Sequence, residues 1–311
     1  MRILVTGAAG FIGPHLVDAL KSEGHDLICP IRRVPAAIAG SAQFITADLN
    51  QPLQLTQKID VIIHCAGTAP REGRSVASLV ADNLEPTRHL IDFARRHPPR
   101  LFLYFSTMSV YGDVAVAEVN EQTPSIAPSA YGMAKLLSEA LLSDEAATFP
   151  TIALRLPAVL GAGAWGHWLS FVLAKAYRHD PIRIFNPSAP FNNAVDLSDL
   201  LGFIATLIGM QHTGFERLTL SFENSLSIQE VATTLLEAVG SESQLEIIEA
   251  ARPSFTIDSS RARNRFGFQS RGCREAIARY ALTPPALQSA YDDAVRVIAA
   301  SASMTAARQA P

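Results

Sequence analysis

Tyr131 and Lys135 stand four residues apart, and this pair can do acid–base chemistry. On a helix, residues four apart lie on the same face, so the phenol and the ammonium can share one site. A free phenol titrates at about pH 10 and is a poor base at neutral pH. A neighbouring positive charge favours the phenolate, and each unit of lowered pKa corresponds to about 1.4 kcal/mol. We therefore expect Tyr131 to remove or donate a substrate's hydroxyl proton, with Lys135 beside it.

A glycine-rich turn follows the apolar residues 3–5 near the start of the chain. The pattern predicts a buried strand, a tight turn and then a helix. Glycine is needed there because a Cβ would block the turn or hold a ligand away, whereas bare backbone amides can approach a pyrophosphate. The turn predicts a dinucleotide site, the alternative being a strand–helix turn without a ligand. The residues expected to contact the dinucleotide are Gly7, Gly10, Phe11, Ile12 and Gly13.

The end of the second predicted strand indicates which cofactor is bound. A carboxylate about 20 residues beyond the turn usually accepts a hydrogen bond from the ribose 2′-hydroxyl of NAD. This sequence has Ile31 followed by Arg32 and Arg33, and guanidinium groups pair with a 2′-phosphate. We therefore expect NADP, with NAD as the alternative if both arginines are ordinary solvated charges. Lys135 would also bind the nicotinamide ribose, and oxidised nicotinamide would further favour the Tyr131 phenolate.

The composition limits the class of protein. The chain has 311 residues, 48% of them hydrophobic, and a net charge of −3, so neither a nucleic acid nor a membrane is expected as a partner. Its three cysteines are odd in number and widely spaced, which argues against disulfides and against a metal site. The first strand is expected from Arg2, which leaves no room for a signal peptide. The expected location is therefore the cytoplasm.

Short apolar runs alternate with helical patterns through the first half of the chain. Strands are expected at 2–5, 26–31, 43–46, 60–65, 100–105 and 151–156. Helices are expected at 11–22, at 76–96 with an interruption at Pro86, and at 129–146. This alternation predicts an α/β fold in which a doubly wound parallel sheet of the Rossmann type is covered by helices on both faces.

The regular alternation of strand and helix patterns ends after Pro157, where glycine and proline separate short elements. We expect residues 1–157 to form the dinucleotide-binding domain, with residues 191–222 returning to it. A smaller C-terminal α/β substrate lobe is expected from residues 158–190 and 223–300, with helices at 228–239, 259–266 and 284–300. Residues 301–311 are small or polar and are expected to be a frayed tail.

The segment from Phe105 to Gly112, FSTMSVYG, precedes Tyr131 and resembles a stretch of the extended short-chain dehydrogenases, also called NAD-dependent epimerase/dehydratases. Together with the TGxxGxxG turn, the resemblance covers about residues 1 to 270. It implies that the Thr107 hydroxyl contacts the substrate oxygen and that Asp48, beside Leu49, accepts a hydrogen bond from the adenine amino group. Small residues after the fourth strand would let the cofactor cross the sheet edge; these are Cys65, Ala66 and Gly67.

The resemblance also implies a reaction and an assembly. Members of this family mostly oxidise, epimerise, dehydrate or reduce sugars carried on nucleoside diphosphates. Many are homodimers joined through the two helices that flank the active site. Dehydratases of the family carry an Asp-Glu pair after the catalytic Thr, but this chain has Met108 and Ser109, so dehydration is not expected.

Two further departures concern the substrate. Ala158 and Asn192 stand where the family usually places an Asn and an Arg that hold a diphosphate, whereas Arg252 remains at the place of another phosphate-binding Arg. Arg71, Arg74 and Arg183 are possible substitutes, although each is better explained as surface charge. Substrate contacts are expected from Ser109, Trp165, His167, Asn192 and Arg252.

These observations predict an NAD(P)-dependent epimerase or oxidoreductase acting at a hydroxyl or carbonyl carbon of a sugar or nucleotide sugar. One alternative is an NADP-dependent carbonyl reductase of a small substrate without a nucleotide. Another is a cofactor-binding protein that has lost catalysis. The intact set of Thr107, Tyr131 and Lys135 argues against the latter.

Overall fold

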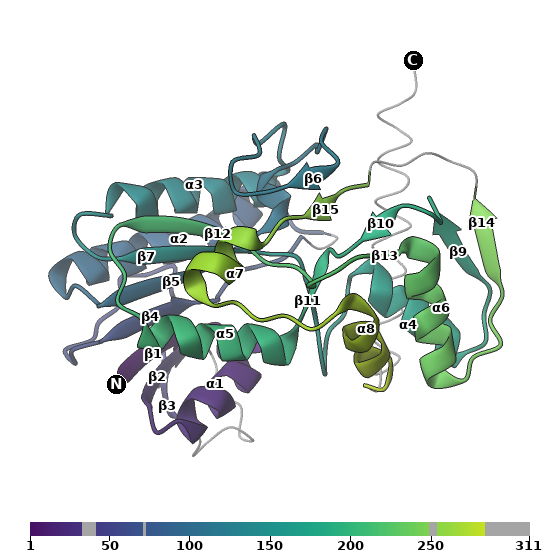
Figure 1. The fold of residues 1–311 in the computed structure, drawn as a ribbon. Coiled ribbons are helices and arrows are strands. Elements are labelled where there is room, and N and C mark those ends of the chain that lie inside the picture. The colour runs from purple at the N-terminus through teal and green to yellow at the C-terminus, as the bar shows by residue number, and fades with distance from the viewer. Residues whose placement is uncertain (33–41, 71–72, 249–253, 284–311) are drawn as a thin grey trace.

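The structure, a computed structural model, describes residues 1–32, 42–70, 73–248 and 254–283. Its centre is a parallel sheet of seven strands in the order β12-β7-β5-β4-β1-β2-β3 (Figure 1). These strands are β1 (Arg2–Thr6), β2 (Asp26–Ile31), β3 (Gln43–Thr46), β4 (Val61–His64), β5 (Leu101–Thr107), β7 (Thr151–Leu156) and β12 (Phe215–Thr219). The predicted doubly wound α/β fold is confirmed, and the strand order reverses between β1 and β4.

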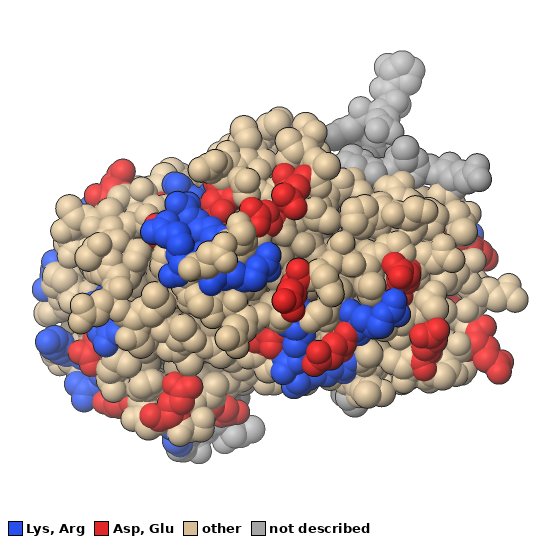
Figure 2. All heavy atoms as spheres, viewed as in Figure 1, with Lys and Arg blue, Asp and Glu red and all other residues tan. Residues whose placement is uncertain are grey.

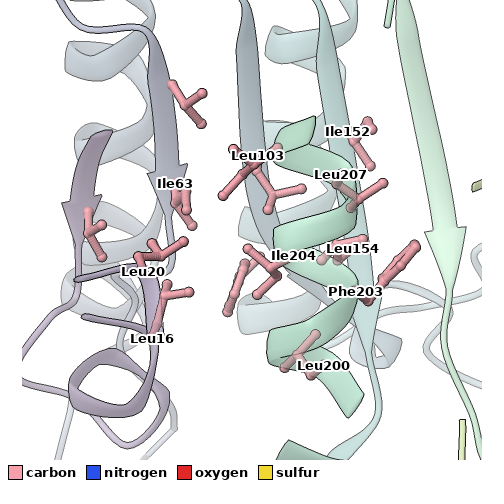
Figure 3. Close-up of a cluster of buried hydrophobic side chains, with 14 of the residues drawn as sticks. Leu16, Leu20, Ile63, Leu103, Ile152, Leu154, Leu200, Phe203, Ile204 and Leu207 are labelled. Atoms are coloured by element: carbon pink, nitrogen blue, oxygen red, sulfur yellow. The ribbon is translucent and has the colours of Figure 1, made fainter. Parts of the chain in front are cut away.

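Helices cover both faces of this sheet because successive strand residues point to opposite sides. On one face, Ile3 and Val5 pack in a core with α1 (Ile12–Ser22) and α5 (Leu197–Gly209). On the other, Leu4 packs in a core with α2 (Val76–Arg96) and α3 (Ala130–Asp144). Figure 3 shows the first core, where Phe203 and Leu207 of α5 lie against strand side chains. Burial on both faces explains why the strands read as continuous apolar runs.

The helix α2 differs from the prediction at Pro86. The expected interruption is wrong, because α2 runs unbroken from Val76 to Arg96 with Pro86 inside it. Proline removes a single intrahelical hydrogen bond, that to the carbonyl of Asp82. Burial of side chains on both sides of the proline, including Leu79 and Leu90, stabilises the continuous helix.

A smaller lobe carries its own core, to the right of the sheet in Figure 1. Its helices are α4 (Trp168–Tyr177), α6 (Ile228–Val239) and α8 (Cys273–Ala281), and β9 (Ile182–Phe185) pairs in parallel with β14 (Leu245–Ile248). The remaining elements are η2 (Met108–Val110), β6 (Glu118–Val119), β8 (Ala158–Leu160), β10 (Pro190–Phe191), β11 (Ala194–Asp196), β13 (Leu226–Ser227), β15 (Thr256–Ile257) and α7 (Ser260–Phe266).

One element expected in the smaller lobe lies elsewhere. Ala262 and Phe266 of α7 join the core of the large sheet, where the ring of Phe268 lies tilted against that of Phe203 of α5, with 5.0 Å between the ring centres. The helix therefore covers the sheet beside β12, because its apolar residues find partners there. The expected helix at 284–300 and the tail at 301–311 lie outside the described residues.

Charged residues link the two lobes. Arg271, just before α8, donates to Asp199 and Ser198 near the start of α5, and forms an ion pair with Asp196. Figure 2 shows positive and negative side chains gathered together over α7 and α8. Within the described ranges, no helix has the length and hydrophobicity that crossing a membrane requires.

We predict opposite effects on stability for two neighbouring changes in α5. Phe203→Ala leaves a cavity between α5 and the sheet and should lower the free energy of unfolding by about 3–5 kcal/mol. Gly202→Ala should raise it by about 0.5–1 kcal/mol, because Gly202 is exposed within the helix and a Cβ there would meet no neighbour. Urea unfolding checks both values. Equal stability of the two variants would contradict the packing described.

Candidate functional site

A cavity of about 300 Å³ opens where the carboxyl ends of β1, β2, β3 and β4 meet. This place is where the strand order reverses, which is where open α/β sheets bind their ligands. Of the residues predicted to bind the cofactor, the cavity brings together Gly7, Gly10, Arg32, Asp48, Leu49, Cys65, Ala66 and Gly67. Phe11, Ile12 and Gly13 are not part of its lining but form the start of α1 directly behind the turn.

The glycine turn is tightly packed at two positions. Gly7 has φ +75°, and a Cβ on it would lie 2.7 Å from the backbone nitrogen of Ala66. A Cβ on Gly13 would overlap the carbonyl oxygen of Gly7 and lie 2.6 Å from the Cα of Ala8. The glycines thus let β1, the turn and α1 approach one another and the residues after β4. The sequence pattern reflects a real steric requirement.

The start of α1 has no side-chain cap. Its N-cap, Phe11, makes no side-chain hydrogen bond, whereas α2 and α3 are capped by Ser75 and Ser129. Backbone amides at an uncapped helix start can bind the pyrophosphate of a dinucleotide, and the glycine turn leaves open the space that a Cβ would fill. The residues of this cavity therefore fit an NAD-type cofactor.

The cavity also contains residues that the sequence did not indicate. Asn50 lies beside Asp48, and its Oδ1 atom is buried without a hydrogen-bond partner in the structure. Asp82 and Pro86 contribute from α2, and Asp82 is paired with Arg74. The turn after β3 could have indicated Asn50, but no sequence signal places α2 against this cavity. Arg33, Arg71 and Arg252 lie outside the described residues.

Thr107, Ser109 and Tyr131 meet because the first turn of α3 sits directly on the end of β5. Ser129 caps α3 by accepting from Gly132 N at 3.2 Å. A Cβ on Gly132 would overlap the carbonyl oxygen of Ser109, so this glycine permits the close approach. The Thr107 hydroxyl accepts from Ser109 N at 3.2 Å and also interacts with the Tyr131 phenol.

Lys135 is buried one turn further along α3. Its Nζ donates to the carbonyl oxygen of Phe105 at 2.9 Å and lies 4.8 Å from the centre of the Tyr104 ring. A Cβ on Gly67 would lie 3.2 Å from this Nζ, so the ammonium borders the cavity at Gly67. Burial lowers the pKa of Lys135 to about 8, although Cys65 and the carboxylate of Glu139 oppose the change. At pH 7 the lysine therefore keeps most of its charge.

The acidity of Tyr131 differs from the expectation. In this structure burial raises the pKa of the phenol, and the interaction with Thr107 only partly offsets that effect. The expectation that Lys135 lowers the pKa of Tyr131 is therefore wrong for the protein alone. The Lys135 ammonium is held by the Phe105 carbonyl, and burial removes water from the phenol. The residue remains a neutral phenol here, which is a proton donor.

Asn192 does not serve the predicted contact with substrate. Its side chain is buried and donates to the carbonyl of Ile257 at 2.8 Å, while its Oδ1 accepts from Ile257 N at 2.8 Å. Both ends of the amide are thus used to hold β15 in place. The expectation of a substrate contact at Asn192 is wrong because the side chain has a structural partner.

The loop before α4 lies over the start of α1. The carbonyl of Ala162 bonds to His15 Nε2 at 3.1 Å, and Gly163 lies close to the Phe11 ring. Trp165 on this loop is 42% exposed. His167 ends the loop as the cap of α4, with its Nε2 buried and without a hydrogen-bond partner, and burial lowers its pKa to about 4. The loop therefore borders the glycine turn from the side of the smaller lobe.

Other polar side chains near the site are structural. His64 is fully buried between the hydroxyls of Thr6 and Thr87, at 2.7 and 3.1 Å, and burial holds its pKa well below the ordinary value. Across the described ranges, no group of three His, Cys, Asp or Glu side chains is placed to hold a metal ion.

Comparison with known proteins gives one family. A model of the NAD dependent epimerase/dehydratase family matches residues 3–212. A Bacillus subtilis protein described as an uncharacterized UDP-glucose epimerase, YtcB, is 28% identical over 294 residues, 85% of this chain and 91% of that one. A dTDP-6-deoxy-L-talose 4-dehydrogenase (NAD(P)(+)) from Kitasatospora kifunensis is 27% identical over 89% of this chain and 93% of its own length.

A solved structure agrees with these relatives. MoeE5 in complex with UDP-glucose and NAD is 26% identical, with a TM-score of 0.75 over 90% of this chain and 97% of that one. The similarity extends over both the parallel sheet and the smaller lobe, since it includes nearly all the described residues.

We predict that Gly7→Ala abolishes dinucleotide binding, because its Cβ would collide with the backbone after β4. Gly24→Ala is the matched control: Gly24 also has a positive φ, +80°, but a Cβ there would meet nothing within 4 Å. Both variants carry the cost of a left-handed alanine, about 1–2 kcal/mol. Calorimetric titration with NAD and NADP should show binding lost in the first and kept in the second. Normal dinucleotide binding by a folded Gly7→Ala protein would contradict the requirement for glycine at this turn.

Proposed function

Because the chain belongs to the NAD dependent epimerase/dehydratase family, we propose that it is an epimerase or dehydrogenase acting on a sugar nucleotide. The reacting centre is a carbon that carries a hydroxyl or carbonyl group. The observation that supports this proposal is the contact of Tyr131 with Thr107 at the end of β5, one helical turn from Lys135, whose ammonium borders the cavity at Gly67. These three residues provide an orienting hydroxyl, a proton donor and a buried positive charge.

The chain's own groups would act as follows. A bound nicotinamide cofactor accepts or supplies the hydride. The Thr107 hydroxyl orients the substrate oxygen toward Tyr131. In reduction the neutral Tyr131 phenol gives its proton to the carbonyl oxygen, and the positive charge of Lys135 stabilises the phenolate that remains. In oxidation the same proton moves in reverse. Lys135 also offers donors to the nicotinamide ribose.

Epimerisation and net redox chemistry use these residues in the same way. An epimerase returns the hydride to the other face of the transient ketone, whereas a dehydrogenase releases the changed cofactor. Dehydration is not part of the proposal, since the side chains of Met108 and Ser109 do not supply the paired carboxylic acid and carboxylate for eliminating water.

A second candidate substrate class is a small sugar or sugar acid without a nucleotide. The observation favouring it is that Asn192, at a position expected to help hold a diphosphate, is bonded to the Ile257 backbone instead. The relatives named for UDP- and dTDP-sugars favour the first candidate. Binding of UDP or dTDP to the protein separates the two classes.

We also propose NADP as the preferred cofactor and a homodimer as the assembly. Arg32 lies in the lining of the cavity beside Ile31, where a ribose 2′-phosphate would meet a positive charge. For the dimer, Met133 and Leu137 on α3 are 50% and 45% exposed and lie one turn apart on the same face. Such an apolar stripe on a helix is suited to burial against a second copy.

We predict that Tyr131→Phe lowers turnover at least about 100-fold while the dissociation constant of the cofactor stays nearly unchanged, because only the transferable proton is lost. Lys135→Met should damage both binding and turnover. The assay is incubation with UDP- and dTDP-sugars, with products separated by chromatography and the cofactor followed by its absorbance at about 340 nm. An epimer formed without net absorbance change indicates an epimerase. Full activity of Tyr131→Phe would exclude this mechanism.

We predict that replacing Arg32 and Arg33 with alanine weakens NADP binding about 10-fold or more, the loss expected for a charged hydrogen bond to phosphate. NAD binding should change by less than about a factor of two, since its ribose hydroxyl does not need a guanidinium. Parallel titrations with the two dinucleotides measure the difference. Equal weakening of both would show that the arginines do not select the cofactor.

A further inference from the structure

Glu139 is a fully buried carboxylate that the mechanism above does not use. It lies one turn beyond Lys135 and two turns beyond Tyr131 on the inner side of α3. A carboxylate is rarely buried unless its charge is paired, so this position needs a reason. The following inference rests on the function proposed above and concerns how its acid–base pair is held.

Four hydrogen-bond donor atoms beside Glu139 come from three neighbouring strands. Ser106 of β5 donates to Oε1 at 2.5 Å. Arg155 of β7 donates through Nε to Oε1 at 3.0 Å and through Nη2 to Oε2 at 2.7 Å. Arg217 of β12 donates through Nε to Oε2 at 3.0 Å. Because β5, β7 and β12 are adjacent in the sheet, one carboxylate fastens α3 to three of its seven strands (Figure 1).

The position of Ser106 connects this anchor to the reacting groups. Ser106 stands between Phe105, whose carbonyl accepts from Lys135, and Thr107, whose hydroxyl interacts with Tyr131. The bond from Ser106 to Glu139 therefore joins α3 to β5 between the two points that Lys135 and Tyr131 use. A helix shifted along β5 would lose all three contacts together.

The charges around Lys135 are few. At the end of β4 lie Cys65 and the neutral, buried His64. The Tyr104 ring lies on β5, and Tyr131 and Glu139 lie on α3 itself. Of these groups, Glu139 carries a full negative charge, and it forms ion pairs with two positive side chains, Arg155 and Arg217. Changes in this cluster should therefore alter how firmly Lys135 holds its proton.

We propose that Glu139 is a positioning residue for the reaction. It locks α3 in register with β5, so that Tyr131 and Lys135 face Thr107 and the cavity. Its carboxylate favours the protonated form of Lys135, one turn away on the same helix.

The test titrates Lys135 itself and needs no substrate. The chain contains four lysines, so protein labelled with ¹³C at the lysine ε-carbon gives a simple NMR spectrum. The Lys135 signal is identified by its loss in Lys135→Met. In the unaltered protein its midpoint should lie near the pKa of about 8. Glu139→Gln should move the midpoint down by about one pH unit, because the negative charge that favours the ammonium is gone.

A second variant moves the same signal in the opposite direction. Arg217→Met removes a positive charge that offsets Glu139, so the Lys135 midpoint should rise. Because the Arg217 side chain is 37% exposed, we expect this variant to fold. It therefore tests the inference even if Glu139→Gln, which leaves Arg155 unpaired, fails to fold. Glu145→Gln is the matched control: it breaks a comparable pair, Arg95–Glu145 at 2.5 Å, at the far end of α3. This control should leave the Lys135 midpoint unchanged.

The outcomes separate this inference from the proposed function. The inference is supported if the Lys135 midpoint falls in Glu139→Gln and rises in Arg217→Met. If only Arg217→Met folds, a higher Lys135 midpoint in that variant supports it. An unmoved midpoint in a folded Arg217→Met protein overturns it, as does an equal shift in Glu145→Gln. Absence of turnover on every sugar nucleotide would count against the proposed function alone, because the titration needs only the folded protein.

Discussion

Parallel pairing of the strands is the constraint on which the rest of the molecule depends. In a parallel sheet all carboxyl ends lie on one edge, so residues that follow β1, β3, β4 and β5 are brought together although they are far apart in sequence. The register of β1 and β4, in which Thr6 faces His64, sets the glycine turn beside Ala66 and Gly67. The register of β5 and β7 similarly places Ser106 beside Arg155. Both halves of the site follow from this pairing.

Close backbone approach connects these two halves. Gly7 and Gly13 let α1 begin against the turn, Gly67 leaves room above the Lys135 ammonium, and Gly132 lets α3 rest on Ser109. At each position a methyl group would enter space held by another segment. The result is a dinucleotide cavity with a lysine at its border and a tyrosine next to that lysine on the same helix. Lys135 and Glu139, the buried charged residues of this helix, both have hydrogen-bond partners.

Much of the fold could be predicted from sequence because it rests on local patterns. The strand β2 and the turn with Gly7, Gly10 and Gly13 were predicted at or near their bounds, since apolar runs and tight turns have short-range causes. The pairing of Tyr131 with Lys135 needed only the period of a helix. Pro86 was misjudged because local rules favour a break, whereas packing on both sides of it is a tertiary effect.

Other features depend on contacts between distant segments. Asn192 was expected to face substrate, but its bonds to Ile257 join residues 65 apart in sequence. The Tyr131 pKa could not be predicted in direction because the loss of hydration on burial is invisible in the sequence. Glu139 carried no signal beyond its helical spacing from Lys135, since its partners come from β5, β7 and β12. These positions required the three-dimensional arrangement.

We infer that the glycine turn and the Tyr131–Lys135 helix serve one bound dinucleotide. The direct measurement follows the four lysine ε-carbon signals while NAD or NADP is added to the labelled protein. We expect the Lys135 signal to shift on binding and the signals of Lys21, Lys58 and Lys175 to stay in place. Saturable binding of the dinucleotide with an unchanged Lys135 signal would contradict it.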